Sequence, residues 1–180
     1  MKTVALYGGS FDPPHIGHEA VVKALADLSF IDEVVVMPTY LNPFKSEFTA
    51  PATLRLKWLD EIFSEYEKVR VSDFEVSLEK KVPTLHTVKH LLKSNAKVYV
   101  VIGADNLASL NSWYGYDELQ NLASFIIASR DNIETPKRYF TINVEVDVSS
   151  SALRKHIDKT KLPQKNGEAI EKFYKEHNAK

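Results

Sequence analysis

The fold is decided by the stretch Gly8-Gly9-Ser10-Phe11-Asp12-Pro13-Pro14-His15-Ile16-Gly17-His18. It follows an apolar run at residues 4–7, typical of a buried strand, and precedes an apolar stripe typical of a helix, at Val21, Ala24, Leu25 and Leu28. Glycines at such a turn permit positive φ and let a ligand approach the backbone closely. Asp12 and Pro13 match a helix cap followed by proline, and a helix N-terminus attracts anions. The sequence therefore predicts a strand, a glycine turn and a helix that together bind an anion.

The rest of the chain alternates between strand and helix periods. Apolar runs predict buried strands at residues 34–36, 98–102 and 125–128, with weaker candidates at 69–71 and 139–146. Helical stripes cover residues 52–66 and 84–92, and a terminal helix carries Ile170, Phe173 and Tyr174 behind a cap at Asn166. This alternation predicts an α/β fold, a doubly wound and mainly parallel sheet with helices on both faces. Ligands of such sheets bind at the carboxyl ends of the strands, where the winding reverses.

Length and composition restrict the class of protein. The 180 residues fit a single domain, residues 1–180, with a small helical part from about residue 150. With 23 basic and 24 acidic residues, the chain lacks the basic excess of a nucleic-acid binder, so we expect no nucleic-acid partner. It contains no cysteine and no apolar run long enough for a signal peptide or a membrane span. We therefore expect a cytoplasmic protein without a membrane partner.

Two histidines stand out in the first motif. His15 and His18 are three residues apart, so on a helix both imidazoles project from the same side near its positive end. There they could donate hydrogen bonds to one phosphate chain. A zinc pair is an alternative on spacing alone, although no thiolate is available and no third ligand is obvious.

A second motif lies at residues 148–154, Val148-Ser149-Ser150-Ser151-Ala152-Leu153-Arg154. We expect it to start another helix, with Ser149 or Ser150 as the cap. Arg154 then adds a cation that can grip phosphate oxygens in a bidentate way. Taken alone, the motif also fits an ordinary serine-capped helix.

The first motif resembles the signature of the nucleotidylyltransferase superfamily, and residues 148–154 resemble its second signature. The resemblance implies a Rossmann-like fold that binds ATP, with the histidines on its phosphates, and transfers AMP to a phosphate of a second substrate. The ATP-binding residues that it implies are Gly8, Gly9, Ser10, Phe11, His15, His18, Gly103, Asp105, Ser149, Ser150 and Arg154.

The middle of the chain is similar to the bacterial nicotinate mononucleotide adenylyltransferase family. The similarity lies in the loop of residues 38–45, the helix start at 82–87, and residues 102–107 through Trp113-Tyr114. It implies that nicotinate mononucleotide and ATP give deamido-NAD and pyrophosphate. The mononucleotide-binding residues that it implies are Ser10, Lys45, Thr84, Trp113, Tyr114 and Arg130. Arg55 also aligns with a basic position of the family. Pro83 stands where the family often has an aromatic residue, and Phe44 departs from the family's loop pattern.

The implied chemistry needs no side-chain nucleophile, because the phosphate of the mononucleotide attacks. We expect catalysis by positioning and charge stabilisation, with His15, His18, Lys45 and Arg154 as donors. The Thr84 helix start would offer N–H groups to the nicotinate carboxylate, and Trp113 would stack on the pyridine. Mg²⁺ would be held mainly by the phosphates, with no metal ligands from the protein. Asp105 could meet a ribose hydroxyl or a metal-bound water, or simply cap a helix.

Several alternatives stay open at this point. A pantetheine-phosphate adenylyltransferase would share both ATP signatures, and a nucleotide-binding regulator could have kept the fold without turnover. Lys45 could be merely solvated, and Trp113-Tyr114 could be packing. His86 and His90, four residues apart, could chelate a metal or lie on a wet helix face. The sequence is compatible with a monomer or a homodimer.

Overall fold

The computed structural model describes residues 1–42, 44, 46–130 and 133–179. Its centre is a six-stranded sheet in the order β3-β2-β1-β4-β5-β6, and every neighbouring pair is parallel. The strands are β1 (Thr3–Gly9), β2 (Glu33–Pro38), β3 (Val69–Val71), β4 (Lys97–Gly103), β5 (Ser124–Ser129) and β6 (Phe140–Asn143). All six predicted strands are present, and the prediction of a mainly parallel sheet is confirmed in the stronger form that all the pairs are parallel.

The two weaker strand candidates are the two edges of the sheet. β3 pairs only with β2, and β6 only with β5. The predicted strand of residues 139–146 is too long, because pairing stops at Asn143, opposite Ser129, where β5 itself ends. Beyond that point the chain has no strand to follow.

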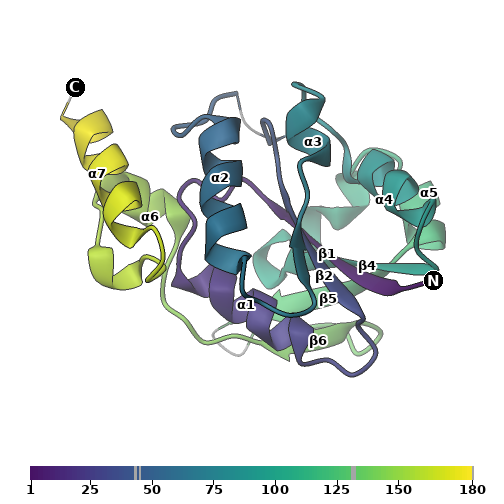
Figure 1. The fold of residues 1–180 in the computed structure, drawn as a ribbon. Helices are drawn as coiled ribbons and strands as arrows, with labels where there is room; N and C mark the ends of the chain where they lie inside the picture. The colour runs from purple at the N-terminus through teal and green to yellow at the C-terminus, as the bar shows by residue number, and fades with distance from the viewer. Residues whose placement is uncertain (43, 45, 131–132, 180) are drawn as a thin grey trace.

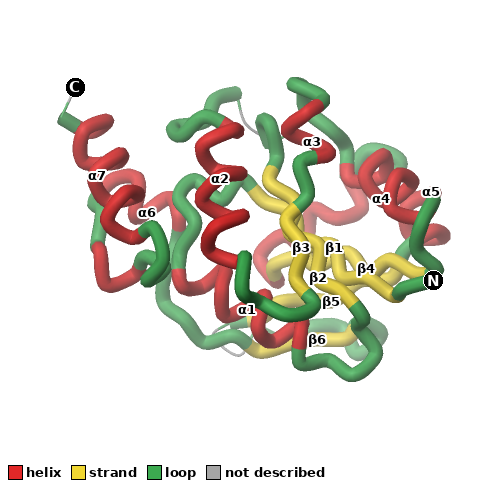
Figure 2. Tube along the Cα trace, in the orientation of Figure 1, coloured by secondary structure: helices red, strands yellow, loops and turns green. Residues whose placement is uncertain are grey.

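Helices cover both faces of the sheet, as expected (Figures 1 and 2). The core on one face joins Val34 and Val36 of β2 to α1 (Ile16–Ala26), α2 (Ala52–Phe63), α6 (Ser150–Lys155) and α7 (Gly167–Asn178). The core on the other face joins Val35 and Met37 to α4 (Thr84–Leu92), α5 (Tyr116–Leu122) and the 3-10 helix η1 (Ala104–Ser112). Alternate residues of each strand thus serve opposite cores, as the pleat of a strand requires.

Two helix boundaries and one cap differ from expectation. The first helix begins at Ile16 with His15 as its cap, so the prediction of a cap at Asp12 followed by Pro13 is wrong. The helix predicted over residues 52–66 ends at Phe63. Asn166 does occupy the cap position of α7, but its side chain makes no cap bond and donates instead to Glu61 at 2.6 Å. Four shorter helices were not predicted. Two of them, α3 (Phe74–Ser77) and η2 (Lys159–Lys161), are too short to show a period, and η1 and α5 each bury a single residue, Leu110 and Leu119, so they show no apolar stripe.

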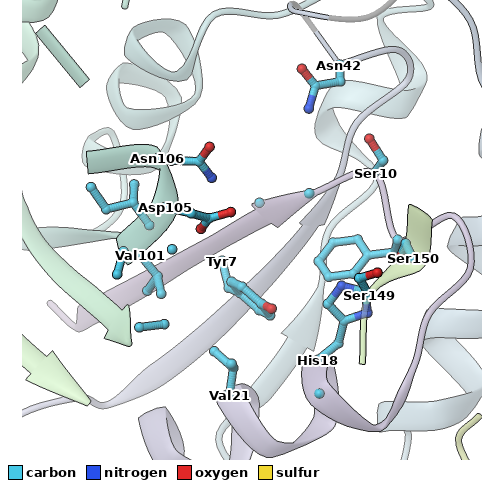
Figure 3. Close-up of a pocket in the computed structure, with 18 of the residues that line it drawn as sticks. Tyr7, Ser10, His18, Val21, Asn42, Val101, Asp105, Asn106, Ser149 and Ser150 are labelled. Atoms are coloured by element: carbon cyan, nitrogen blue, oxygen red, sulfur yellow. The ribbon is translucent and has the colours of Figure 1, made fainter. Parts of the chain in front are cut away.

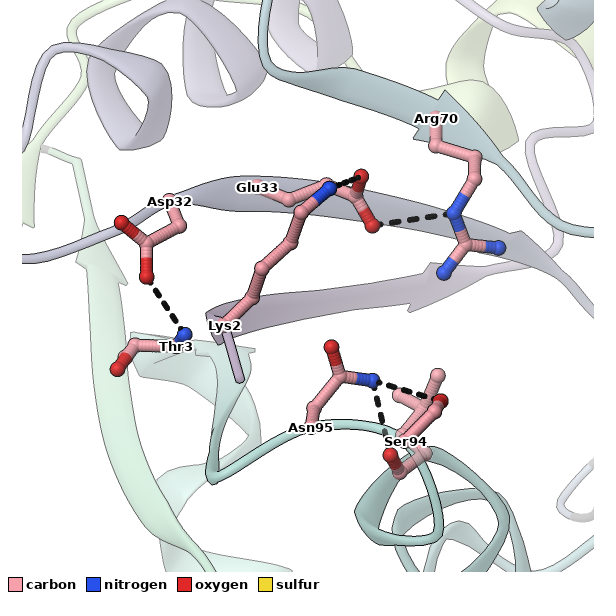
Figure 4. A network of polar contacts seen from close by, with 8 residues as sticks. Lys2, Thr3, Asp32, Glu33, Arg70, Ser94 and Asn95 are labelled. Atoms are coloured by element: carbon pink, nitrogen blue, oxygen red, sulfur yellow. Dashed lines mark hydrogen bonds and ion pairs between the residues drawn. The ribbon is translucent and has the colours of Figure 1, made fainter.

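Polar contacts tie the starts of the strands together (Figure 4). Glu33, the first residue of β2, accepts hydrogen bonds from Lys2 at 2.9 Å and from Arg70 at 3.0 Å. It thus connects the residue before β1 to β3. Asp32 accepts the N–H of Thr3 at 2.7 Å. Lys2 and Arg70 are largely exposed, so these two ion pairs contribute little stability each.

The winding of the sheet reverses at β1, which lies between β2 and β4. The carboxyl ends of β1 and β4 therefore diverge into loops that turn to opposite faces and leave a crevice between them. Among the described residues, no helix is long and apolar enough to cross a membrane.

Candidate active site

A cavity of about 820 Å³ opens at the carboxyl ends of β1, β4 and β5, where the winding reverses (Figure 3). Its size suits a nucleotide or another small ligand. Most residues singled out in the sequence line it, namely Gly8, Gly9, Ser10, Phe11, His15, His18, Thr84, Gly103, Asp105, Trp113, Arg130, Ser149, Ser150 and Arg154.

Two of the expected site residues are not assigned to the cavity, for different reasons. Lys45 lies outside the described residues. Tyr114 is 65% exposed and packs edge to face against His86, with ring centroids 5.6 Å apart. The assignment of both residues to the substrate stays a prediction.

The two histidines cap the first helix reciprocally. His15 Nδ1 accepts the N–H of Gly17 at 3.1 Å and of His18 at 3.3 Å, and His18 Nδ1 accepts the N–H of His15 at 3.1 Å. Their rings stack with centroids 3.6 Å apart. A nitrogen that accepts a hydrogen bond carries no proton, so in each neutral ring the proton is on Nε2. Each histidine therefore keeps one N–H donor that the cap does not use.

Burial keeps both histidines neutral at pH 7. It lowers the pKa of His15 to about 4, with a further contribution from the positive charge of Arg130. Burial also holds the pKa of His18 well below its usual value, and the neighbouring His15 adds to this. The pair thus supplies oriented donors, and among the described residues the positive charge of the cavity comes from Arg130 and Arg154.

The second motif is attached directly to the first. Arg154 donates to the backbone carbonyl of Asp12 at 2.9 Å, across 142 positions of sequence, and Ser150 donates to the carbonyl of Pro13 at 2.8 Å. Ser149 caps α6 by accepting the N–H of Ala152 at 3.1 Å, as predicted. The two sequence motifs therefore form one wall of the cavity.

A buried arginine organises the loops below this wall. Arg55 is 1% exposed. It donates four hydrogen bonds to backbone carbonyls, at 2.8 Å to Ala50, 2.6 Å to Ser10, 2.8 Å to Thr39 and 2.9 Å to Tyr40. Arg55 therefore holds the loop after β2 against the loop after β1, and it does not line the cavity.

Asp12 also connects the loop after β1 to the loop after β2. Its carboxylate accepts the N–H groups of Thr49 at 2.7 Å and Ala50 at 2.9 Å, and it also accepts the hydroxyl of Tyr174 from α7. Burial and the adjacent Asp12 raise the pKa of Tyr174, so that its hydroxyl stays protonated and remains a donor. The first motif is thus supported by three separate parts of the chain.

The opposite wall of the cavity comes from the other face of the sheet. Thr84 is the first residue of α4, which has Pro83 at its cap and no side-chain cap bond. The N–H of His86 bonds to the carbonyl of Pro83 at 2.9 Å, so the N–H groups of Thr84 and Leu85 are the ones without a partner among the described residues. Asp105 lies in the first turn of η1, and its carboxylate makes no hydrogen bond with a described residue. A Cβ on Gly103 would lie 2.6 Å from Asp105 Oδ1, so a larger residue there would displace the Asp105 carboxylate.

Some residues that line the cavity were missed in the sequence. They include Thr39, Asn42, Glu75, Asn106, Ser109 and Ser112. Asn106 could have been found, because it directly follows the predicted Asp105. Glu75 gave no signal, because it lies on the single turn of α3.

No cluster of three or more His, Cys, Asp or Glu side chains arranged for a metal occurs within the described part of the chain. There, the zinc alternative for His15 and His18 has no third ligand. Their Nδ1 atoms are also occupied by the helix cap.

The parallel sheet with its reversal of winding at β1, the two motifs and the donor-lined cavity define a nucleotide-binding α/β protein. Comparison with known proteins agrees with this class. Residues 6–156 match the cytidylyltransferase-like family model. "Probable nicotinate-nucleotide adenylyltransferase" proteins are 54% identical in Sulfurimonas denitrificans, over 100% of this chain and 99% of the relative. The protein of the same name in Campylobacter fetus is 42% identical, over 98% of this chain and 99% of the relative.

A solved structure shows the same fold. The Plasmodium falciparum nicotinic acid mononucleotide adenylyltransferase complexed with NaAD superimposes with a TM-score of 0.77 at 23% identity, covering 99% of this chain and 97% of that one. The chain belongs to the nicotinate-nucleotide adenylyltransferases, within the cytidylyltransferase-like family. It is therefore a nucleotidyltransferase enzyme.

Proposed function

We propose that the enzyme transfers AMP from ATP to the phosphate of nicotinate mononucleotide, giving deamido-NAD and pyrophosphate. The observation that carries this proposal is the stacked pair His15 and His18, whose free Nε2–H donors share one cavity with Arg154. The names of the relatives agree with this substrate.

In the proposed reaction, a phosphate oxygen of the mononucleotide attacks the α-phosphorus of ATP. The bond from this phosphorus to the oxygen that bridges to the β-phosphate breaks, and pyrophosphate leaves with the electron pair. Negative charge grows on the leaving group, where the Nε2–H donors of His15 and His18 and the guanidinium of Arg154 stabilise it. Since the attacking phosphate is already anionic, no side-chain base is required.

The mononucleotide arm occupies the opposite wall. The open N–H groups at the start of α4, beside Thr84, suit the pyridine carboxylate, and Trp113 offers a flat ring for stacking. Ser10 and Arg130 line the same cavity, where Arg130 donates to the carbonyl of Val148 at 2.9 Å, and Lys45 and Tyr114 would complete the site from the loops. We assign Asp105, whose carboxylate lines the cavity, to a ribose hydroxyl or a metal-bound water.

The residues present fit Mg²⁺ that arrives with the nucleotide. Mg²⁺ typically takes one or two carboxylates together with substrate phosphates and waters, and the carboxylate of Asp105 lines the cavity without a hydrogen-bond partner among the described residues. When bound, the ion would neutralise part of the charge of the triphosphate.

Product analysis tests the substrate. The protein is incubated with Mg-ATP and, in separate reactions, nicotinate mononucleotide, nicotinamide mononucleotide and phosphopantetheine, and the products are weighed by mass spectrometry. We expect deamido-NAD and pyrophosphate. Dephospho-coenzyme A alone would favour the pantetheine-phosphate alternative, and ATP binding without pyrophosphate release would favour a regulator.

A donor deletion tests the mechanism. His18→Asn keeps an acceptor at the position of Nδ1, and so preserves the cap, but it places no donor where Nε2–H was. Removal of one such donor typically costs on the order of 10²–10³ in turnover, and His18→Ala should lose at least as much. His177→Asn, at the exposed end of α7, is the matched control. Activity of His18→Asn within tenfold of the wild type would overturn the assigned role.

A further inference from the structure

One buried acid of the cavity has no part in the proposed mechanism. Glu75, on α3, is 6% exposed and lines the cavity. Its Oε1 accepts the hydroxyl of Thr87 at 2.5 Å. Its Oε2 makes no hydrogen bond with a described residue. This atom is not fully buried, because Glu75 is absent from the residues with a fully buried polar atom that lacks a partner. Since the residue lines the cavity, the cavity is the open space that this oxygen can face.

The position of Glu75 is on the mononucleotide side. Thr87 follows Thr84 by three residues on α4, so the two lie on the same side of its first turn. Val82, Thr84 and Trp113 line the cavity together with Glu75. The carboxyl group therefore lies beside the helix start to which the pyridine carboxylate is assigned.

No ionic partner among the described residues is hydrogen-bonded to this acid. Its helix packs against β2 and α2, and Thr87 brings α4 into contact. The titratable side chains on these elements are Glu33, Arg55, Lys57, Asp60, Glu61, His86, Lys89 and His90. The other titratable side chains that line the cavity belong to different elements; they are Tyr7, His15, His18, Asp105, Arg130 and Arg154.

Burial raises the pKa of Glu75 to about 7, and the hydrogen bond from Thr87 opposes this only in part. A carboxyl group with this pKa changes between its neutral and ionised forms near neutral pH. Its neutral form can donate a hydrogen bond, whereas its ionised form can only accept one.

We propose that Glu75 is a specificity-determining residue: its neutral form donates to the carboxylate of nicotinate mononucleotide, and its ionised form repels that carboxylate and accepts the amide N–H of nicotinamide mononucleotide. This inference rests on the proposed function. It predicts that the preference between the two mononucleotides changes with pH.

The test is the ratio of kcat/KM for nicotinate mononucleotide to kcat/KM for nicotinamide mononucleotide, measured from pH 6 to 8. Because both substrates carry the same phosphate, its titration cancels in the ratio. For an acid with a pKa of about 7, the neutral fraction falls about tenfold over this range and the ionised fraction rises about tenfold, so we expect the ratio to fall by about 10- to 100-fold.

Two variants separate this effect from a structural one. Glu75→Gln keeps an acceptor for Thr87 but cannot ionise, so its ratio should be independent of pH. Thr87→Val removes the bond that lowers the pKa of Glu75, so it should move the change in ratio to higher pH. Glu79→Gln removes an exposed carboxylate just after α3 and should retain the wild-type profile.

The outcomes distinguish the two proposals. If the wild type uses neither mononucleotide, the proposed function fails. If it uses them with a ratio that does not change with pH, or if Glu75→Gln keeps the wild-type pH dependence, the role of Glu75 fails while the proposed function stands.

Discussion

The hydroxyl of Tyr174, on α7, donates a hydrogen bond to the carboxylate of Asp12, in the loop after β1. The two residues are 162 positions apart, and both are buried, at 0% and 3% exposure. The same carboxylate holds the N–H groups of Thr49 and Ala50. The last helix therefore supports the loop that carries the catalytic motif.

We expect Tyr174→Phe to lower the free energy of unfolding by about 1–3 kcal/mol, because it leaves a buried carboxylate short of one donor. Chemical denaturation measures this. The matched control is Tyr66→Phe, which removes a hydroxyl bonded to Glu19 at 2.7 Å at a part-buried position, and its loss should be smaller. Equal losses in the two variants would contradict a special role for the buried pair.

Arg55→Lys should be strongly destabilising although it conserves the charge. A lysine ammonium cannot reproduce the planar fork that serves four carbonyls, so some of these buried acceptors lose their partners. We expect a loss of about 2–4 kcal/mol in the free energy of unfolding. Arg70→Lys, at an exposed side chain paired with Glu33, should change it by less than about 0.5 kcal/mol. A similar small change at Arg55 would show that its bonds are dispensable.

Stability should fall in acid because of the histidine pair. Above pH 6.5, His15 is neutral in both the folded and the unfolded chain, so it has no effect. As the pH falls, the unfolded chain takes up a proton near 6.5 and the folded chain only near 4, so the unfolded state is favoured. His15→Asn keeps a cap acceptor but does not titrate. Between pH 7 and pH 4, its free energy of unfolding should therefore rise by about 3 kcal/mol relative to that of the wild type. Denaturation at a series of pH values measures this, and a difference in free energy of unfolding between the two proteins that does not change with pH would rule it out.

Gly17→Ala should affect activity more than stability. A Cβ at Gly17 would lie 2.9 Å from Cε1 of His15 and 2.9 Å from Cγ1 of Val148, so His15 or the second motif must move. A displacement of this kind can reduce turnover by about 10²-fold. Gly167→Ala, whose Cβ would meet only Leu162 at 3.8 Å, is the control and should retain activity. An active Gly17→Ala enzyme would mean that the placement of His15 is not critical.

The strands and the main helices were predictable because their periods extend over several residues. Residues 84–92 were predicted as a helix with the bounds that the structure has. The start of α1 was not predictable from Asp12 and Pro13, because Asp12 is used for tertiary bonds to Thr49, Ala50 and Tyr174 and so is unavailable as a cap. At this position the tertiary hydrogen bonds of Asp12 outweigh its local preference for a helix cap.

The candidate site was predicted largely through its resemblance to a family, and what was missed is informative. The motif residues line one cavity, but the roles of Asp12 and Arg55 depend on loops distant in sequence. Glu75 was missed because its burial is created by the packing of α3 against the neighbouring elements, which a single turn of sequence does not reveal.

The bond between Tyr174 and Asp12 also orders events during synthesis of the chain. The ribosome makes β1 and its loop first and α7 last, and domains generally fold as units as they emerge. Asp12 therefore waits for 162 further residues before its last donor arrives. A nascent chain that lacks α7 would carry both signature motifs and still lack one of the three donors to the carboxylate of Asp12.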